Sequence, residues 1–80
     1  MSDWQTRITV DPDIMVGKPV IRGTRIPVEL IVRMLGQGIS EEEILKDYPR
    51  LQSEDIRAAL TYAASVLARE DIFPTAMLNT

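Results

Sequence analysis

The sequence predicts a mainly α fold, a three-helix helix-turn-helix domain preceded by a small N-terminal β-hairpin or extended arm. Apolar residues recur at helical spacing in three segments after residue 26, and capping and turn residues separate these segments. The residues before them are rich in β-branched residues, glycine and proline. The 80 residues are expected to form one domain, with a β-hairpin or basic arm at 1–26, a helical core at 27–70 and an apolar tail at 71–80.

The arm is predicted to contain two short strands. Ile8–Val10 alternates apolar and polar residues and is β-branched, which favours a strand. Asp11–Asp13, with a central proline, has turn chemistry and ends that strand. Lys18–Arg22 can form a second strand at a sheet edge, where a proline is tolerated. Trp4 precedes the strands and is expected to cover the small core, since an indole ring buries a large area.

A glycine- and proline-rich basic loop connects the arm to the first helix. Gly17 and Gly23 permit positive φ, and two prolines stiffen the chain, so three cations project from a backbone with little freedom. These cations are Lys18, Arg22 and Arg25. Chemistry alone favours a well-specified connector with solvated cations. The alternative is a rigid loop that positions its cations for a partner.

The first helix is predicted to begin at Pro27, because proline suits the first helical position. Its buried face follows the i, i+3, i+4, i+7 pattern, and Gly36 or Gly38 is expected to end it. The residues of that face are Val28, Ile31, Val32 and Leu35, widened by Leu30 and Met34.

The second helix has an explicit start signal. Ser40 and Glu43 match the S-x-x-E capping box, and Glu41–Glu43 lie where the helix dipole favours anions. That explanation is sufficient for the acidic residues without a metal or catalytic role. Ile44, Leu45 and Tyr48 are expected to face inward, and Pro49 ends the helix.

The third helix is predicted to open with Ser53 as its N-cap, with Glu54 and Asp55 in the first turn. One face is apolar and the opposite face is polar. The apolar face contains Ile56, Leu60, Ala63 and Leu67, and the polar face contains Arg57, Thr61, Ser65 and Arg69.

Composition excludes several classes of function. The chain has no cysteine and no histidine, so it offers no disulfide, no thiolate or imidazole metal ligand and no Cys or His catalysis. It also lacks a nucleophile–base pair and a phosphate-binding glycine motif, so we expect no enzyme activity, cofactor or metal. No apolar run reaches the roughly 20 residues that span a bilayer, and no signal peptide is evident. A cytoplasmic protein without membrane contact is therefore expected.

The charge is unevenly distributed. The net charge is −3; residues 1–33 carry five cations and four acids (+1), and residues 34–80 carry four cations and eight acids (−4). A strongly DNA-binding domain is usually basic. Any contact with nucleic acid therefore needs the basic loop as well as a helix.

The short turn between the second and third helices fits a helix-turn-helix, although helical hairpins that bind no DNA share this plan. Arg57 can read a guanine edge and Gln52 an adenine edge. Glu54 and Asp55 argue against DNA contact, because both would face phosphate. The candidate DNA-binding residues are Lys18, Arg22, Arg25, Gln52, Ser53, Arg57 and Thr61, with Ser65 further along the same helix face.

Several ordered motifs resemble those of the domain-of-unknown-function 433 (DUF433) family. The motifs are Ile8–Pro12, Gly17–Val28, Gly38–Ile44, Tyr48–Leu51 and Glu54–Ala63. The resemblance implies a small helix-turn-helix protein of the antitoxin type. Such a protein represses its own promoter and neutralises a ribonuclease toxin of the PIN-like type. The alternative is a protein-interaction module that binds a toxin or another partner without binding DNA.

A homodimer is also expected, because an 80-residue domain buries a modest share of its surface. Its predicted interface consists of Tyr62 and Val66 on the third helix and Ile72, Phe73, Met77 and Leu78 in the tail. The competing interpretation is that the tail binds the toxin and folds only on its partner.

Overall fold

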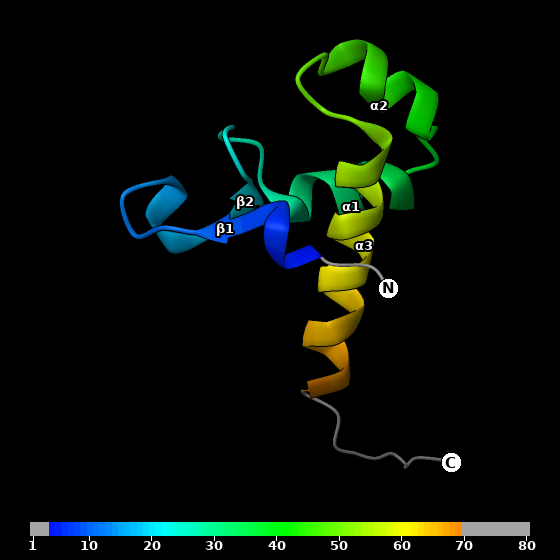
Figure 1. Ribbon diagram of the computed structural model, residues 1–80. Coiled ribbons are helices and arrows are strands. Elements are labelled where there is room, and N and C mark those ends of the chain that lie inside the picture. The colour runs from blue at the N-terminus through cyan, green and yellow to red at the C-terminus, as the bar shows by residue number, and fades with distance from the viewer. Residues whose placement is uncertain (1–3, 70–80) are drawn as a thin grey trace, which may run out of the picture.

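The computed structural model describes residues 4–69, and it confirms the predicted fold class (Figure 1). Three helices follow a two-stranded antiparallel hairpin in this part of the chain. The elements are the 3-10 turn η1 (Trp4–Thr6), β1 (Ile8–Val10), the turn η2 (Met15–Gly17), β2 (Pro19–Ile21), α1 (Val28–Gly36), α2 (Glu41–Asp47) and α3 (Ser53–Arg69). None of the helices in residues 4–69 is long and apolar enough to cross a membrane.

The hairpin pairs Ile8 with Ile21 and Val10 with Pro19. Ile8 and Ile21 are buried where the hairpin meets the helices, whereas Val10 is 56% exposed. The far end of the hairpin therefore projects away from the helices, as Figure 1 shows at its left side. The second strand is shorter than the predicted Lys18–Arg22.

The connection that closes the hairpin has unusual backbone geometry. Met15 and Val16 have φ of 52° and 55°, and Gly17 follows with φ of 80°. A β-branched residue in this left-handed region is a conformational outlier. Val16 is also 93% exposed, so its side chain gains no burial in the fold.

The first helix starts one residue later than predicted. Pro27 has an extended backbone (ψ 145°) and is the N-cap, so Val28 is the first helical residue. The helix buries Val28, Ile31 and Met34, and Val32 and Leu35 of the predicted face are partly buried and pack against the core. Gly38, with φ of 90°, completes a Schellman motif in which the Ile39 amide donates to Met34 O and the Gly38 amide to Leu35 O.

The predicted capping box of α2 is confirmed. The Glu43 amide donates to Ser40 Oγ at 3.1 Å, and the Ser40 amide donates to Glu43 Oε1 at 3.3 Å. Ile44 is fully buried, Leu45 and Tyr48 are partly buried, and the helix ends just before Tyr48-Pro49. Leu51 in the following turn is 5% exposed and fixes that turn on the core.

The start of α3 differs from the prediction by one residue. Ser53 is the first helical residue, and the carbonyl of Gln52 accepts the first helical hydrogen bonds, from Asp55 N and Ile56 N. Gln52 is therefore the N-cap. The backbone amide of Gln52 donates to Asp55 Oδ2 at 2.9 Å, so the carboxylate three residues further along the chain caps the start of the helix.

The buried face of α3 is rotated relative to the predicted face. Ile56, Ala58 and Ala59 are buried, whereas Leu60 is 44% exposed and Leu67 is 69% exposed. The prediction was wrong for these two leucines. The helix packs mainly on α1 and η1, and its small residues allow close approach of the backbones.

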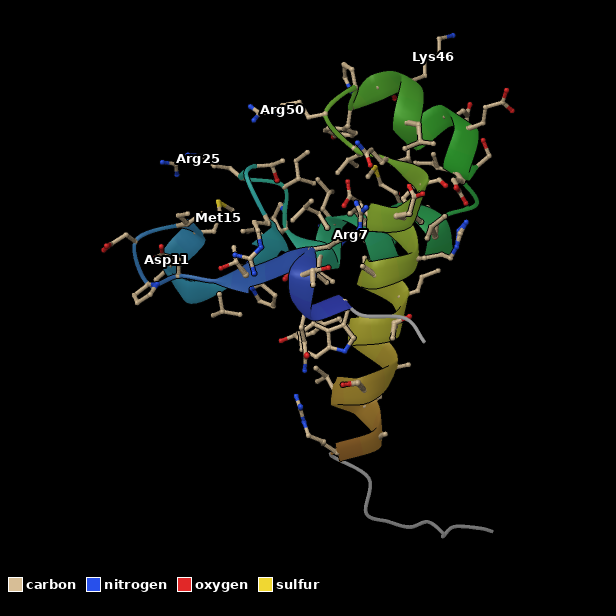
Figure 2. All side chains as sticks on the ribbon, in the orientation of Figure 1. Arg7, Asp11, Met15, Arg25, Lys46 and Arg50 are labelled. Carbon is tan, nitrogen blue, oxygen red and sulfur yellow. The ribbon has the colours of Figure 1, made fainter. Side chains whose placement is uncertain are left out.

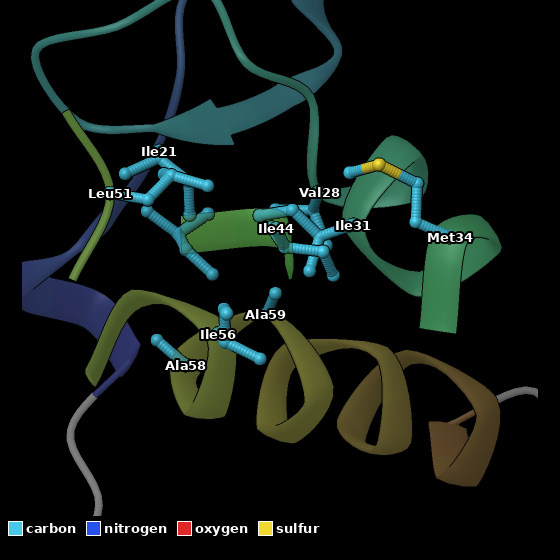
Figure 3. Packing of buried hydrophobic residues seen from close by; sticks show 10 residues of the cluster. Ile21, Val28, Ile31, Met34, Ile44, Leu51, Ile56, Ala58 and Ala59 are labelled. Atoms are coloured by element: carbon cyan, nitrogen blue, oxygen red, sulfur yellow. The ribbon is translucent and has the colours of Figure 1, made fainter. Parts of the chain in front are cut away.

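The hydrophobic core is formed by buried residues from the hairpin, the three helices and the α2–α3 turn. In Figure 3, Ile56 and Ala59 project from α3 toward Ile31 of α1 and Ile44 of α2. The Trp4 and Tyr62 rings pack in an edge-to-face arrangement, with centroids 4.9 Å apart and planes at 77°. Trp4 thus packs against the core and holds η1 on α3.

Candidate nucleic-acid interface

Three arginines from separate segments line one polar concavity. Arg7 precedes β1, Arg22 follows β2, and Arg50 lies in the turn between α2 and α3. The concavity has a volume of about 410 Å³, and its lining is completed by Thr6, Gln52 and Asp55. These six residues are called the arginine concavity below. It lies beside the first turn of α3, because Gln52 and Asp55 belong to the start of that helix.

Arg22 is held firmly against the backbone. Its Nε donates to Thr6 O at 3.1 Å, and its Nη2 donates to Gln5 O at 3.1 Å and to Ile8 O at 3.5 Å. The backbone amide of Arg22 also donates to Arg7 O at 2.8 Å. These contacts fix the direction of the guanidinium group and tie the end of β2 to η1.

Arg50 is held in a similar way by the loop that follows β2. Its Nη2 donates to Gly23 O at 2.8 Å, so the α2–α3 turn is joined to the loop before α1. Arg50 and Arg25 both line a neighbouring concavity of about 330 Å³ with Ile14 and Gly23. Figure 2 shows the side chains of Arg25 and Arg50 extending toward the same side of the molecule.

Arg7 is paired with a buried carboxylate. Its Nη1 lies 2.9 Å from Oδ1 of Asp55, a residue that is only 6% exposed. The second carboxylate oxygen accepts from the Gln52 amide. The sequence suggested that Asp55 would face phosphate. In the structure its carboxylate is buried and paired with Arg7 instead. Among the described residues that line the arginine concavity, three arginines and this carboxylate give a net charge of +2.

The structure brings together some of the predicted DNA-binding residues and separates others. Arg22 and Gln52 line the arginine concavity and Arg25 lies in the neighbouring one. Lys18 lies on a different surface and pairs with Glu29 at 3.5 Å. The remaining residues, Ser53, Arg57 and Thr61, lie on α3 outside the arginine concavity, with Arg57 exposed and the other two partly buried.

Sequence reasoning missed Arg7 and Arg50 as site residues. Nothing in their spacing connects them, because the two residues and Arg22 meet only after the hairpin and the α2–α3 turn have folded together. The excess of cations in the first 33 residues was a signal for Arg7, but Arg50 lies outside that range.

A second surface feature is an apolar groove between α1 and the C-terminal half of α3. It has a volume of about 560 Å³, and the predicted interface residues Tyr62 and Val66 both line it. Glu29 at its rim pairs with Lys18 and, at 2.8 Å, with Arg33. The apolar lining is Pro19, Pro27, Val28, Val32, Tyr62, Ala63, Val66 and Leu67. The predicted tail residues Ile72, Phe73, Met77 and Leu78 lie outside the described residues.

The groove continues onto the outer face of α3. Leu60, Ala64 and Leu67 are all exposed and lie about one helical turn apart, so they form an apolar stripe. These three residues are called the outer stripe below. Soluble monomers rarely expose extended apolar surface, so the groove and the outer stripe together indicate a contact surface.

The features of the described residues that could bind a partner are the cations of the arginine concavity and the apolar groove with the outer stripe. Within residues 4–69, no group of three or more His, Cys, Asp or Glu side chains comes together in a way that could hold a metal ion. The arginine concavity can donate several hydrogen bonds to an anion, and guanidinium groups match the oxygens of phosphate well.

Comparison with known proteins places the chain in a family. The family described as "Protein of unknown function (DUF433)" matches residues 8–63. Protein y4eO of Sinorhizobium fredii, itself uncharacterised, is 45% identical over 56 residues, which are 70% of this chain and 25% of that protein. An uncharacterised protein of Archaeoglobus fulgidus is 64% identical over 28 residues, 35% of this chain and 78% of that protein. The chain thus spans a quarter of the length of the rhizobial relative.

A solved structure agrees with the family assignment. The crystal structure of a DUF433 member protein from Anabaena variabilis is similar to this chain with a TM-score of 0.75 and 37% sequence identity. The similarity covers 81% of this chain and 64% of that chain. With the family match over most of the folded residues, this chain belongs to the DUF433 family of proteins of unknown function.

Proposed function

We propose that this protein is an antitoxin-like DNA-binding protein that represses its own promoter and neutralises a ribonuclease toxin. The observation that carries the proposal is the convergence of Arg7, Arg22 and Arg50 beside the first turn of α3. A helix-turn-helix contacts DNA with the N-terminal part of its second helix, while neighbouring segments contact the backbone. This position of the cations supports a role in phosphate contacts.

The two kinds of contact are assigned to different residues. Arg22, Arg25 and Arg50 contact phosphates, which gives affinity without sequence preference. Gln52 and the exposed Arg57 read base edges, since an amide suits adenine and a guanidinium suits guanine. Arg22 has a second role, because its hydrogen bonds to η1 also stabilise the fold.

The overall negative charge sets the strength of the interaction. With a net charge of −3, the protein is repelled by DNA except at its arginine-rich face. Binding is therefore weak and depends strongly on salt, because counterion release provides most of the driving force. Two copies acting together on a palindromic site raise the affinity.

The apolar groove favours a second candidate function, a protein-interaction module. The groove between α1 and α3 has the form that accepts an amphipathic helix of a partner. The family resemblance suggests that this partner is a PIN-like ribonuclease toxin. In this second function the protein binds its partner without contacting DNA.

The outer stripe provides the homodimer contact that accompanies the first function. When the α3 helices of two copies lie antiparallel, Leu60 of one copy faces Leu67 of the other if the two-fold axis passes between positions 63 and 64. Both of these positions are alanine, and small side chains let the helix backbones approach closely. A two-fold dimer also presents paired helix-turn-helix units to a palindromic DNA site.

A promoter-binding experiment separates the two functions. The full-length protein is mixed at low salt with a DNA fragment from upstream of its own gene and with an unrelated fragment of equal length. We expect a mobility shift for both fragments, with tighter binding to the first. If neither fragment shifts, DNA binding is excluded and the protein-interaction function takes its place. Addition of the adjacent gene product then tests that function directly.

A further inference from the structure

We propose that the arginine concavity is a preformed clamp for a single phosphate group of the nucleic-acid backbone. This inference rests on the proposed DNA-binding function and assigns a particular set of side chains to one contact. The clamp consists of Arg22 and Arg50, which donate to the phosphate oxygens, whereas the charge of Arg7 is balanced by Asp55.

Anchoring by the protein backbone leaves the guanidinium groups able to bind a ligand. Arg22 donates from Nε and Nη2 to backbone carbonyl oxygens, and Arg50 donates from Nη2 to Gly23 O. Among the hydrogen bonds of the described residues, none uses the Nη1 of either arginine. Both Nη1 groups can therefore donate to an anion, and the side chains lose little freedom on binding because they are already fixed.

Among the described residues that line the concavity, the carboxylate is that of Asp55, and both of its oxygens have partners. Asp55 Oδ1 faces the Arg7 guanidinium at 2.9 Å, and Oδ2 accepts from the Gln52 amide at 2.9 Å. Asp55 lines the concavity, but it is only 6% exposed and its charge is balanced by Arg7. The exposed charged side chains among the described lining residues are Arg22 and Arg50, which favour an anion.

The position of the concavity also favours phosphate. It lies at the first turn of α3, a helix of 17 residues whose dipole favours an anion, and the Asp55 carboxylate already accepts from the Gln52 backbone amide there. The concavity is lined by charged and polar residues, in contrast to the apolar groove on the far half of α3. A phosphate diester is small, carries one negative charge and accepts several hydrogen bonds, so it matches this lining.

The competing explanation is that the three arginines only connect segments of the fold. That explanation predicts that replacing Arg50 lowers the melting temperature without affecting anion binding. The clamp predicts loss of anion binding in a folded protein. Arg50 is the best residue to change, because it is exposed and makes a single hydrogen bond to Gly23 among the described contacts.

The experiment measures binding of inorganic phosphate and then of a short DNA duplex to the full-length protein. Phosphate is titrated to tens of millimolar against chloride at constant ionic strength, and NMR follows the backbone amide of Gln52 and the arginine side-chain N–H groups. The duplex is then titrated by fluorescence anisotropy at several salt concentrations. The proteins compared are wild type, Arg50→Ala, Arg50→Lys and, as a matched control, Arg69→Ala. Arg69 is an exposed arginine at the opposite end of α3.

We expect phosphate to shift the signals of Gln52, Arg22 and Arg50 in the wild type and in Arg69→Ala. Arg50→Ala should lose these shifts and bind the duplex about tenfold more weakly, because a hydrogen-bonded charge contact is lost. Its log–log salt slope should flatten by about 0.9. Arg50→Lys should recover part of the affinity, since it keeps the charge but loses the planar fork.

The outcomes separate this inference from the proposed function. If phosphate shifts these signals but the duplex does not bind, the concavity is a phosphate site, and both its assignment to the nucleic-acid backbone and the DNA-binding function are wrong. If the duplex binds and folded Arg50→Ala and Arg50→Lys behave like Arg69→Ala, the clamp is wrong and the function stands. If phosphate shifts only signals remote from the concavity, the clamp is also overturned.

Discussion

Arg7 and Asp55, 48 positions apart in the chain, are joined by an ion pair with 2.9 Å between Nη1 and Oδ1. The contact links the residue before β1 to the first turn of α3. The same carboxylate caps α3 through the Gln52 amide, so one buried side chain fixes both the start of the helix and the base of the hairpin. The position of the arginine concavity depends on this link.

The Arg7–Asp55 pair is expected to contribute to stability well beyond a surface ion pair. Asp55→Ala should lower the free energy of unfolding by about 2 kcal/mol, because it removes a helix cap and leaves Arg7 without its buried partner. A double-mutant cycle with Arg7→Ala, measured by urea denaturation, should give a coupling energy of about 1 kcal/mol. The exposed pair of Glu29 and Arg33 is the control and should couple by only about 0.3–0.5 kcal/mol. Equal coupling in the two pairs would contradict this account.

Gly23 is expected to be required for its backbone conformation alone. Its φ is +82°, and a Cβ at this position would meet no atom within 4 Å. Gly23→Ala should therefore cost about 1 kcal/mol through backbone strain, and Gly23→Val should cost more. Gly36→Ala is the matched control, because that position is equally open and is helical. Thermal unfolding that places Gly23→Ala and Gly36→Ala at the same melting temperature would exclude backbone strain as the cause.

Val16 is expected to lower the free energy of unfolding relative to a residue that tolerates positive φ. Its φ of 55° and ψ of 39° are unfavourable for a β-branched residue, and its side chain is almost fully exposed. Val16→Asn should raise the free energy of unfolding by about 1 kcal/mol, because asparagine tolerates the left-handed region. Val10→Asn, in the extended backbone of β1, should give no such gain. A less stable Val16→Asn protein would mean that the valine makes a stabilising contact.

The proposed dimer predicts a simple cross-linking result. The protein has no cysteine, so Ala64→Cys introduces one thiol close to the two-fold axis of the antiparallel α3 pair. Mild oxidation should yield a covalent dimer, since the two thiols meet within disulfide distance. Gln37→Cys, exposed after the end of α1, should remain largely monomeric under the same conditions. Equal cross-linking of both variants would indicate random collision instead of a specific interface.

Local sequence signals predicted the elements of this fold well. The Ser40–Glu43 capping box and the role of Gly38 at the end of α1 follow from hydrogen bonds between near neighbours, and both are present. The hairpin was predictable for the same reason, because β-branched residues and a turn lie close together in the chain. These features depend on only a few adjacent residues.

Features that depend on tertiary packing were harder to predict. Leu60 and Leu67 fit the helical period of a buried face, but α3 packs through Ala58 and Ala59 and leaves both leucines exposed. Asp55 fits a helix-start charge, and only the folded chain shows that Arg7 neutralises it. Arg7 and Arg50 were not predicted as site residues for the same reason. Their proximity arises from the packing of segments that are distant in sequence.

The salt dependence of DNA binding tests the central proposal most directly. Fluorescence anisotropy of a labelled promoter duplex, measured at several potassium chloride concentrations, gives the slope of log K against log salt. With one phosphate held by Arg22 and Arg50 together and a second contacted by Arg25, the predicted slope is about −1.8 for each bound protomer. Replacing Arg25 and Arg50 together by alanine should flatten it by about 1.8. Absence of binding at low salt, or a slope that the double substitution leaves unchanged, would contradict the assignment of this face to DNA.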